Sequence, residues 1–214
     1  MKKILLIGDS IRMGYDKYVK MALDGVAEVF SPTENCRFTQ YVLRFFHKWL
    51  EDSGFGEETD LVHWNVGLWD VIQIMDDEPI TPIEVYEAYL HRICKRIKLL
   101  CPKAKVVFAT STPIVEAKVS PLYFRHNTTI EEYNAAAVRA LAGTGTVIND
   151  LYALTATCPE EYHSDAVHYY TDAGTEYIGR RVLSEICAAL DIKAGEVNLA
   201  DFRPEEYSTK KIGY

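Results

Sequence analysis

Short apolar segments alternate five times with longer amphipathic segments along this chain of 214 residues. The apolar segments are rich in Val, Ile and Leu and are flanked by Gly, Asp or Pro, as is typical of strands that are buried on both faces of a sheet. They comprise Lys3–Ile7, Val26–Phe30, Leu61–Val66, Lys105–Thr110 and Thr146–Asn149. Repeated strand–helix alternation predicts a parallel sheet with helices on both faces.

The amphipathic segments have the spacing of helices that bury one face. In the clearest of them, apolar residues recur every three or four positions, Pro82 suits the first turn and Pro102 lies just past the end. Thr171 with Asp172 is suited to open the last helix as its N-cap. The predicted helices are Tyr15–Leu23, Thr39–Glu51, Ile83–Leu100, Ile130–Leu141 and Thr171–Leu190. The fold class is therefore α/β, a flavodoxin-like three-layer α/β/α sandwich around a five-stranded parallel sheet, in which ligands bind beyond the carboxyl ends of the strands.

Composition narrows the environment and the partners. The net charge is −8 and the Lys and Arg residues are scattered, which argues against nucleic acid or an anionic membrane surface as a partner. No apolar run approaches the roughly 20 residues that cross a bilayer, and Ile4–Ile7 is too short for the core of a signal peptide. Five cysteines without a C-x-x-C pair argue against a disulfide framework or a zinc ribbon. We therefore predict a cytoplasmic protein.

The chain shows no internal repeat and no low-complexity linker before about Asp191. We predict one catalytic domain over residues 1–190 and a polar C-terminal extension over residues 191–214. The extension is weakly patterned, which leaves open whether it packs on the body, reaches a neighbouring subunit of a homo-oligomer or is disordered.

Three polar segments lie after predicted strands or before the last predicted helix. Gly8-Asp9-Ser10 joins the first strand to the first helix, where the serine suits either a ligand-binding turn or an ordinary helix cap. In Asp165-Ala166-Val167-His168 the carboxylate can turn back to the imidazole and fix its tautomer, although a surface Asp and His would give the same pattern. Asn65-Val66-Gly67-Leu68-Trp69-Asp70 offers an Asn after the third strand, either as an oxyanion donor or as a buried amide bonded to backbone.

Taken together, these segments resemble the SGNH hydrolases, the GDSL family of esterases and lipases. Gly8-Asp9-Ser10 matches the nucleophile motif of that family, and Asp165-x-x-His168 matches its acid–base motif at the far end of the chain. The resemblance covers the chain from Lys3 to about Leu190. It implies an α/β/α sandwich and an esterase without cofactor, in which Ser10 is the nucleophile, His168 the base and Asp165 the residue that orients the base.

The oxyanion hole that the resemblance implies is less complete. In the family it consists of the backbone N–H of the nucleophile, here Ser10, the N–H of a glycine after the second strand, and an Asn in a Gly-x-Asn-Asp motif after the third. Cys36 or Arg37 stands where the glycine is expected, and Trp69 stands where the Asn is expected. Any residue type can supply a backbone N–H, whereas Trp replaces a small amide by a bulky donor.

Other polar and aromatic residues are candidates for the rest of the site. Asn65 is our first candidate for the missing side-chain donor to the oxyanion, and Asn35 is the second. The long loop Ser111–Thr129, with its prolines and aromatics, favours a wall or lid over the site. The predicted substrate contacts are Asp9, Arg12, Asn35, Trp69 and Tyr123.

A second chemistry for the His168 segment would be metal binding. His163, Asp165 and His168 form a His-x-Asp-x-x-His cluster. No second ligand cluster accompanies it and a triad accounts for two of its residues, so we predict neither a metal nor a cofactor.

The sequence leaves three functions to compare. The first is a carboxylic ester hydrolase acting on small acyl esters, with acetyl esters of carbohydrates as candidate substrates, as the resemblance implies. The second, motivated by Trp69, is a catalytically weak or inactive relative that binds a glycan or a small acylated ligand. The third, a nucleotide or phosphate binder, is disfavoured because the chain has no glycine-rich phosphate loop. We predict the first, with a small-molecule ester as the only partner that catalysis requires.

Overall fold

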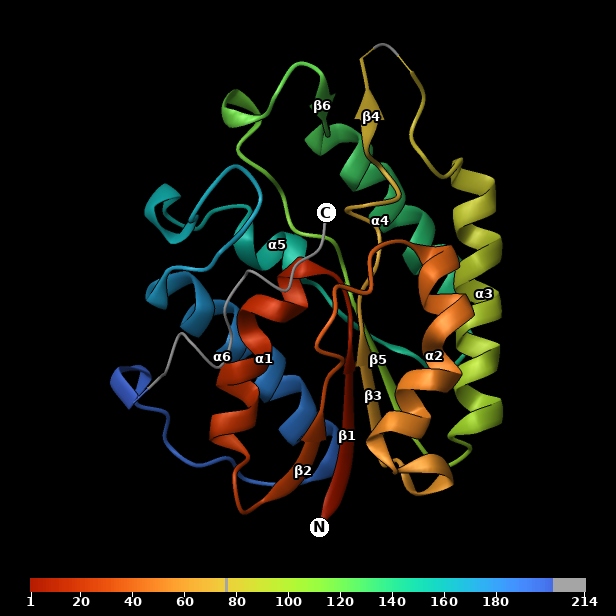
Figure 1. The fold of residues 1–214 in the computed structure, drawn as a ribbon, viewed down its shortest axis with the longest axis vertical. Helices are drawn as coiled ribbons and strands as arrows, with labels where there is room; N and C mark the ends of the chain where they lie inside the picture. Colours follow the sequence, from red (N-terminus) through yellow and green to blue (C-terminus); the bar gives the residue numbers. More distant parts are fainter. Residues whose placement is uncertain (76, 202–214) are drawn as a thin grey trace.

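A parallel sheet forms the centre of the computed structural model, which describes residues 1–75 and 77–201 (Figure 1). The strand order is β2-β1-β3-β5-β7, and every neighbouring pair is parallel. This is the order of doubly wound flavodoxin-like folds. The strands are β1 (Lys2–Ile7), β2 (Ala27–Phe30), β3 (Leu61–Trp64), β5 (Lys105–Ala109) and β7 (Val147–Asn149). The predicted five-stranded parallel sheet is confirmed.

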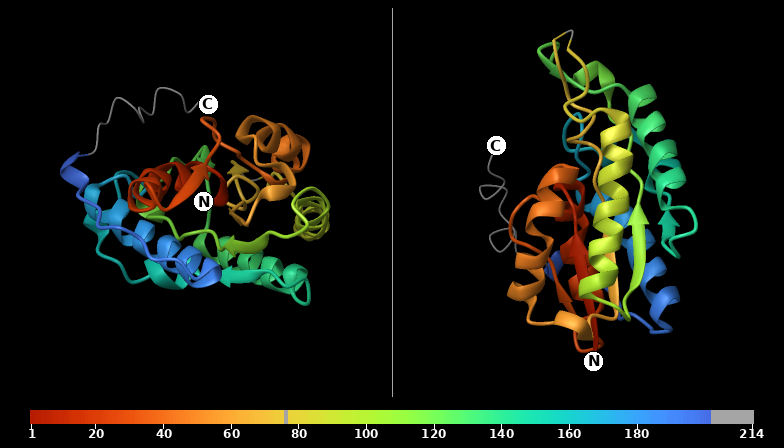
Figure 2. Two further views of the ribbon diagram at one scale, coloured as in Figure 1. Left: turned by 90° about the horizontal axis from the view of Figure 1, so that it is seen from below. Right: turned by 90° about the vertical axis from the view of Figure 1, so that its right-hand side faces the viewer.

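Helices cover both faces of the sheet, as Figure 2 shows. Helix α1 (Ser10–Ala22) packs against α6 (Asp172–Leu190) on one face. On the other face α3 (Ile83–Leu100) packs between α2 (Thr39–Ser53) and α4 (Asn127–Leu141). The three-layer α/β/α arrangement is therefore confirmed.

The first helix starts earlier than the amphipathic pattern indicates. It begins at Ser10 rather than at Tyr15, because the Asp9 side chain accepts a hydrogen bond from the N–H of Ile11 and caps it. The first five residues of the helix include Ser10, Arg12 and Gly14, which conceal the apolar periodicity. The early start makes Ser10 the first residue of the helix.

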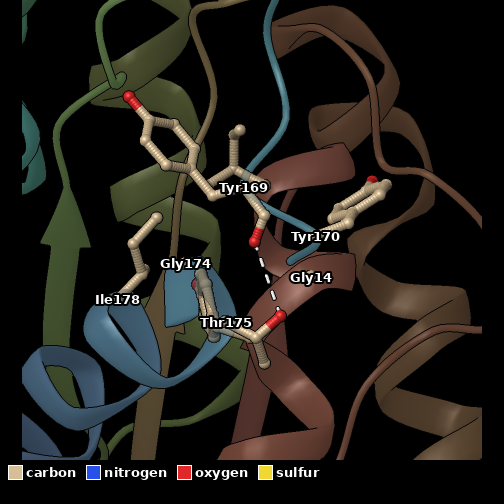
Figure 3. Close-up of a pocket in the computed structure, with 8 residues that line it drawn as sticks. Gly14, Tyr169, Tyr170, Gly174, Thr175 and Ile178 are labelled. Carbon is tan, nitrogen blue, oxygen red and sulfur yellow. Dashed lines mark hydrogen bonds between the residues drawn. The ribbon is translucent and has the colours of Figure 1, made fainter. Parts of the chain in front are cut away.

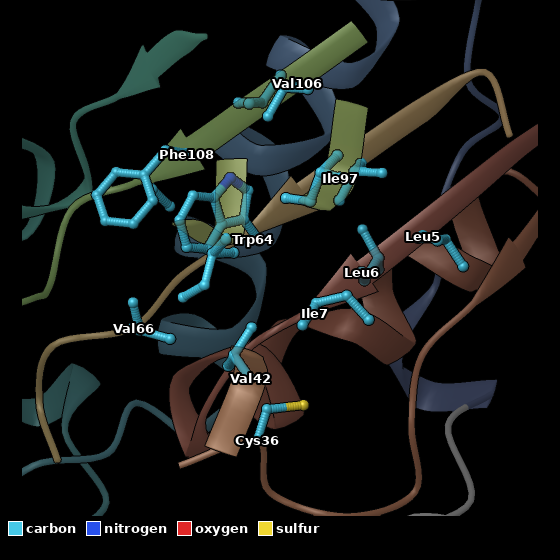
Figure 4. Close-up of a cluster of buried hydrophobic side chains, with 14 of the residues drawn as sticks. Leu5, Leu6, Ile7, Cys36, Val42, Trp64, Val66, Ile97, Val106 and Phe108 are labelled. Atoms are coloured by element: carbon cyan, nitrogen blue, oxygen red, sulfur yellow. The ribbon is translucent and has the colours of Figure 1, made fainter. Parts of the chain in front are cut away.

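The core explains why the strands are continuous apolar runs. Leu5, Leu6 and Ile7 follow one another on β1 and none of them is exposed, because successive side chains point to opposite faces and both faces are covered (Figure 4). On the neighbouring strands β3 and β5, Trp64 and Phe108 are in register, with their ring centroids 4.8 Å apart.

The carboxyl edge of the sheet carries a small structure that the sequence did not indicate. Strands β4 (Gln73–Ile74) and β6 (Tyr123–Phe124) form an antiparallel pair at the top of Figure 1. Strand β6 lies inside the loop predicted as a wall or lid. Two-residue strands are too short to show a period-two pattern. Likewise, the five residues of α5 (Leu151–Thr155) are too few to show helical periodicity.

The described part of the C-terminal extension packs on the body. The N–H of Ile192 donates to Cys187 O, and the N–H of Gly195 donates to Ala22 O at 2.8 Å. Residues 202–214 lie outside the described residues, so the division into residues 1–190 and 191–214 stays a prediction. None of the helices in residues 1–75 and 77–201 combines the length and apolar character that crossing a bilayer requires.

Candidate active site

Ser10 lies at the carboxyl edge of the sheet, where β1 passes into α1. Asp9 occupies the N-cap position, so Ser10 is the first helical residue and its backbone N–H has no acceptor within the helix. The positive end of the helix dipole lies at the same place. The side chain therefore stands beside groups that favour a developing negative charge.

His168 is brought to Ser10 from the other end of the chain. Its Nε2 lies 2.8 Å from Ser10 Oγ, and its Nδ1 lies 2.7 Å from Asp165 Oδ2. A neutral ring bonded to a carboxylate through Nδ1 carries its proton there, which leaves Nε2 as the acceptor for the serine hydroxyl. The three residues predicted to be catalytic thus form one continuous hydrogen-bonded chain.

Asp165 is held by local backbone hydrogen bonds on an exposed loop. Its Oδ1 accepts the N–H groups of Val167 at 2.7 Å and of His168 at 2.8 Å. Partial burial raises the pKa of Asp165, but these hydrogen bonds and the one to the His168 ring outweigh it, so the pKa lies below its usual value. The side chain is 54% exposed against 14% for His168, so water screens its attraction for an imidazolium ion.

Tyr170 connects the base to the nucleophile, and the sequence reasoning missed it. Its ring stacks on His168 with centroids 4.7 Å apart, and its hydroxyl donates to Ser10 O at 2.7 Å. Burial raises the pKa of Tyr170, which keeps the hydroxyl protonated as a donor. A Cβ at Gly14 would lie 2.8 Å from Tyr170 Cε1, so only glycine lets the ring lie on α1 this closely (Figure 3). Because Gly14 lies just before the predicted helix Tyr15–Leu23, the sequence carried no signal for this contact.

The loop that carries His168 is also tied to α6. Thr175 Oγ1 donates to Tyr169 O at 3.4 Å across a narrow hollow between α1, α6 and the loop (Figure 3). The N–H of Ser164 donates to His168 O at 2.8 Å and closes the loop on itself. The base is therefore positioned by its own loop and by two helices.

Asn65 supports the nucleophile turn from beneath. Its Nδ2 donates to Asp9 Oδ1 at 2.8 Å, and its Oδ1 accepts the Tyr15 hydroxyl at 3.4 Å. A Cβ at Gly8 would lie 2.0 Å from Asn65 Oδ1, so the glycine of the motif makes this contact possible. Asn65 is 3% exposed and already donates within the protein. This geometry favours the reading of Asn65 as a buried, satisfied amide over the reading as an oxyanion donor.

The hydrogen bonds continue from Tyr15 through the sheet. His63 Nδ1 lies 3.2 Å from the Tyr15 hydroxyl, and its Nε2 lies 3.3 Å from Asn149 Nδ2. Arg181 Nε donates to Asn149 Oδ1 at 3.0 Å. Burial lowers the pKa of His63 to about 3, so the ring is neutral. Because Asn149 Nδ2 can only donate, the ring proton lies on Nδ1 and faces Tyr15.

Two predicted substrate contacts are corrected. Arg12 is 1% exposed, and its guanidinium pairs with Asp16 at 2.7 Å and donates to the carbonyl oxygens of Pro32 and Glu34. It anchors α1 to the β2–α2 connection, because a buried guanidinium needs acceptors on several sides. Asp9 has no exposed surface, so its carboxylate serves Ile11 and Asn65 and not a substrate.

The predicted oxyanion donors after β2 are also engaged. The N–H of Cys36 donates to Gly8 O at 3.1 Å, and the N–H of Arg37 donates to Asn35 Oδ1 at 2.8 Å. Arg37 has φ of 53°, in the left-handed region that favours glycine, so it takes the conformation expected of the missing glycine. Neither N–H is open to an oxyanion in this geometry, which corrects that part of the prediction.

Asn35 keeps a donor that has no use within the described part of the chain. Its Nδ2 is enclosed and lacks a hydrogen-bond partner, although its Oδ1 is bonded to Arg37. The Cys36–Gly8 hydrogen bond places Asn35 beside the strand that leads to Ser10. Trp69 and Tyr123 both lie at the carboxyl edge, where Trp69 is partly exposed and Tyr123 is 36% exposed. Their role as substrate contacts stays a prediction.

The described residues of this region do not form a metal site. Within residues 1–75 and 77–201 no three His, Cys, Asp or Glu side chains are grouped as metal ligands. The ring of His163 instead packs on Tyr169 with centroids 4.0 Å apart.

Solved structures of esterases and lipases share this fold. A lipase/acylhydrolase from Enterococcus faecalis is 21% identical, with a TM-score of 0.69, 92% of this chain covered and all of that chain. An acetylxylan esterase from Geobacillus stearothermophilus is 20% identical, with a TM-score of 0.65 and 86% and 94% covered. A GDSL-like lipase from Bacteroides thetaiotaomicron is 16% identical, with a TM-score of 0.64 and 88% and 89% covered. No protein-family model and no curated protein matches the sequence. At these identities the likeness shows the fold, which is the one the sequence resemblance implied.

Proposed function

We propose that this protein is a serine esterase of the SGNH type that hydrolyses small acyl esters. One observation carries the proposal: the hydrogen-bonded chain from Ser10 Oγ through His168 to Asp165, at the carboxyl edge of a doubly wound sheet. The fold of lipases and acetylxylan esterases supports it. A small-molecule substrate and a cytoplasmic location belong to the same proposal.

The reaction proceeds through an acyl-enzyme. His168 Nε2 takes the proton of Ser10 Oγ while Oγ attacks the ester carbonyl carbon. The tetrahedral intermediate collapses, His168 gives that proton to the alkoxide oxygen, and the alcohol leaves. Water then attacks the acyl carbon with His168 again as base, and the carboxylic acid departs as Ser10 recovers its proton.

The oxyanion needs donors that the protein does not use itself. The Ser10 N–H, at the first turn of α1, is one. Asn35 Nδ2 is the second donor we propose in place of Asn65, because it has no hydrogen-bond partner among the described residues while the Asn65 amide is bonded to Asp9. Since Nδ2 is enclosed in the absence of substrate, the Asn35 side chain must turn toward the oxyanion when the ester binds. The positive end of α1 adds to both.

Acetyl esters of carbohydrates are the substrate class we propose first. Its support is the name of the acetylxylan esterases among the structures that share the fold. A catalytically weak glycan-binding relative stays as the second candidate, because Trp69 stands where the resemblance implies an Asn.

The test is hydrolysis of p-nitrophenyl acetate, butyrate and octanoate by the wild-type protein and by Ser10→Ala. We expect turnover that Ser10→Ala lowers by at least about 10⁴-fold, since removing a member of a catalytic triad costs that much or more. The chain-length profile sizes the acyl pocket. Equal turnover in both proteins would contradict the mechanism, and labelling of Ser10 by an organophosphonate would separate a slow esterase from a binding protein.

A further inference from the structure

Arg125 is a buried arginine at the carboxyl edge that the mechanism does not use. It follows β6 directly and precedes α4, and it is 5% exposed. Its Nε donates to Leu68 O, in the connection that leaves β3. That connection begins at Asn65, the residue bonded to Asp9, so Arg125 is tied to the segment that supports the nucleophile turn.

The charge of Arg125 acts on that turn. Burial raises the pKa of Asp9, and the hydrogen bonds from Ile11 and Asn65 together with the charge of Arg125 oppose the rise. Arg125 thus influences the carboxylate next to Ser10. Because interactions between charges weaken with distance, Arg125 belongs to the same end of the structure as the reacting groups.

The guanidinium has donors without acceptors. Arginine carries five N–H donors, of which Leu68 O takes the one on Nε. In the part of the chain that the structure describes, Nη1 and Nη2 have neither a hydrogen-bond acceptor nor an ion-pair partner. The Tyr123 ring covers the guanidinium carbon at 5.4 Å and offers no lone pair to the outer nitrogens.

Arg12 provides the internal comparison. It is equally buried, but a carboxylate and backbone carbonyl oxygens surround its outer nitrogens. A guanidinium removed from water is strongly unfavourable without such partners. The outer nitrogens of Arg125 are not among the enclosed side-chain atoms that lack a partner, so they reach solvent from a side chain that is otherwise buried. Arg125 is therefore nearly as buried as a structural arginine, whereas its outer nitrogens, Nη1 and Nη2, are available as in a ligand-binding arginine.

We propose that Arg125 binds a carboxylate on the substrate, so that the preferred substrates are esters carrying one negative charge. The planar fork of Nη1 and Nη2 matches the two oxygens of a carboxylate, and the Tyr123 ring holds the guanidinium plane. The inference rests on the proposed esterase function and narrows its substrate class to anionic esters, among them acetylated carbohydrates that carry a carboxylate. The carboxylate belongs either to the acyl part or to the alcohol part of the ester.

The experiment uses matched pairs of esters. The alcohol-side pair is 4-acetoxybenzoate and its neutral methyl ester, and the acyl-side pair is p-nitrophenyl monoadipate and p-nitrophenyl hexanoate. For each pair we measure kcat/KM of the anionic ester over the neutral one, in wild type and in Arg125→Gln. Comparing the same pair between proteins cancels the intrinsic reactivity of the esters.

We expect the ratio for one pair to fall about 10- to 100-fold in Arg125→Gln, the size of a lost charge-assisted hydrogen-bonded contact. Arg125→Lys keeps the charge without the fork and should fall in between. The control is Arg139→Gln on α4, which removes the same charge from an exposed side chain paired with Glu87 and should keep both ratios. The pair that responds identifies which part of the ester carries the carboxylate.

Unchanged ratios for both pairs in a folded Arg125→Gln protein would overturn the proposal and leave Arg125 as a counter-charge for Asp9. If Arg125→Gln does not fold, inhibition of wild-type acetate hydrolysis by benzoate but not by benzamide is the expected result, and equal inhibition overturns the proposal. A wild-type protein that hydrolyses none of the esters contradicts the esterase instead. Calorimetric titration with benzoate and benzamide then tests the anion site, and equal binding of the two overturns it.

Discussion

The two sides of the candidate site are held in different ways. On the nucleophile side, Asp9 and Asn65 are buried and bonded to each other, and the hydrogen bonds continue through Tyr15 and His63 into the sheet. On the base side, Asp165 is 54% exposed, and its partners lie within three residues of it along the chain.

This difference follows from where each side originates. The nucleophile turn ends a central strand, so its polar groups must find partners inside the protein. The base stands on a loop that water reaches, so its acid partner is screened and its position depends on packing against α1 and α6. Substitutions on the nucleophile side should therefore affect stability and rate together, whereas those on the base side should affect the rate alone.

Among substitutions on the nucleophile side that leave the triad intact, we expect Asn35→Asp to lower kcat the most. Aspartate keeps the acceptor for the Arg37 N–H but replaces the enclosed Nδ2 donor by an oxygen. Loss of one oxyanion donor lowers kcat by about 10²–10³-fold. Steady-state kinetics on p-nitrophenyl acetate measures this, with Asn198→Asp on the remote C-terminal segment as the matched control. An unchanged kcat would remove Asn35 from the oxyanion hole.

The buried hydrogen bonds of His63 should make the stability of the protein depend on pH in the acid range. The pKa of His63 is lowered to about 3 in the folded protein and is about 6.5 when unfolded, so between these values the unfolded chain binds more protons. The stability that neutral His63 permits above pH 6.5 is therefore lost as the pH falls toward 3. Relative to His63→Gln, the wild-type free energy of unfolding should fall by about 1.4 kcal/mol per pH unit between pH 6 and 4.

Denaturant titrations at several pH values measure this difference. The exposed His91 gives the control, since His91→Gln should reproduce the wild-type dependence. Parallel curves for wild type and His63→Gln would show that the ring is not held neutral.

Asp165→Asn probes the exposed side. If the Asn Oδ1 keeps the backbone N–H groups, its Nδ2 faces His168 Nδ1 as a donor and disfavours the tautomer that leaves Nε2 free to accept. Because the side chain is 54% exposed, it can turn away and leave water as the partner of Nδ1, which limits the loss. We expect kcat to fall about 10- to 100-fold, less than the roughly 10⁴-fold cost of the same change in a buried triad. The melting temperature should stay within a degree or two. A loss near 10⁴-fold would mean that the Asp165 side chain is buried when substrate binds.

Tyr170→Phe should have the smallest effect, because it keeps the ring stacked on His168 and removes only the hydrogen bond to Ser10 O. A neutral hydrogen bond contributes about 1 kcal/mol, so we expect kcat to fall up to about fivefold. Tyr177→Phe, which removes a hydroxyl that donates to the backbone oxygen of Leu154, serves as the matched control. A loss as large as that of Asp165→Asn would show that the two sides of the site are coupled through this one hydroxyl.

Several strands, helices and site residues could be predicted from the sequence because they depend on local pattern. The apolar runs and the spacing of three or four in Ile83–Leu100 predicted the sheet and its helices, since burial on both faces leaves a readable periodicity. The two motifs predicted Ser10, Asp165 and His168, which the structure brings within hydrogen-bond distance. The β4–β6 pair was out of reach, because two-residue strands carry no period.

By itself, the sequence determined which residues carry reactive groups and which segments form strands and helices, because both depend on residue type and spacing along the chain. Only the tertiary structure decided which donors and charges are already used. It assigned Arg12 to buried carbonyl groups, Asn65 to Asp9 and the Cys36 N–H to Gly8. Among residues 1–75 and 77–201 it left Asn35 Nδ2 and the outer nitrogens of Arg125 without partners. The physical reason is that hydrogen-bond satisfaction depends on distances between segments far apart in the chain, which no local pattern encodes.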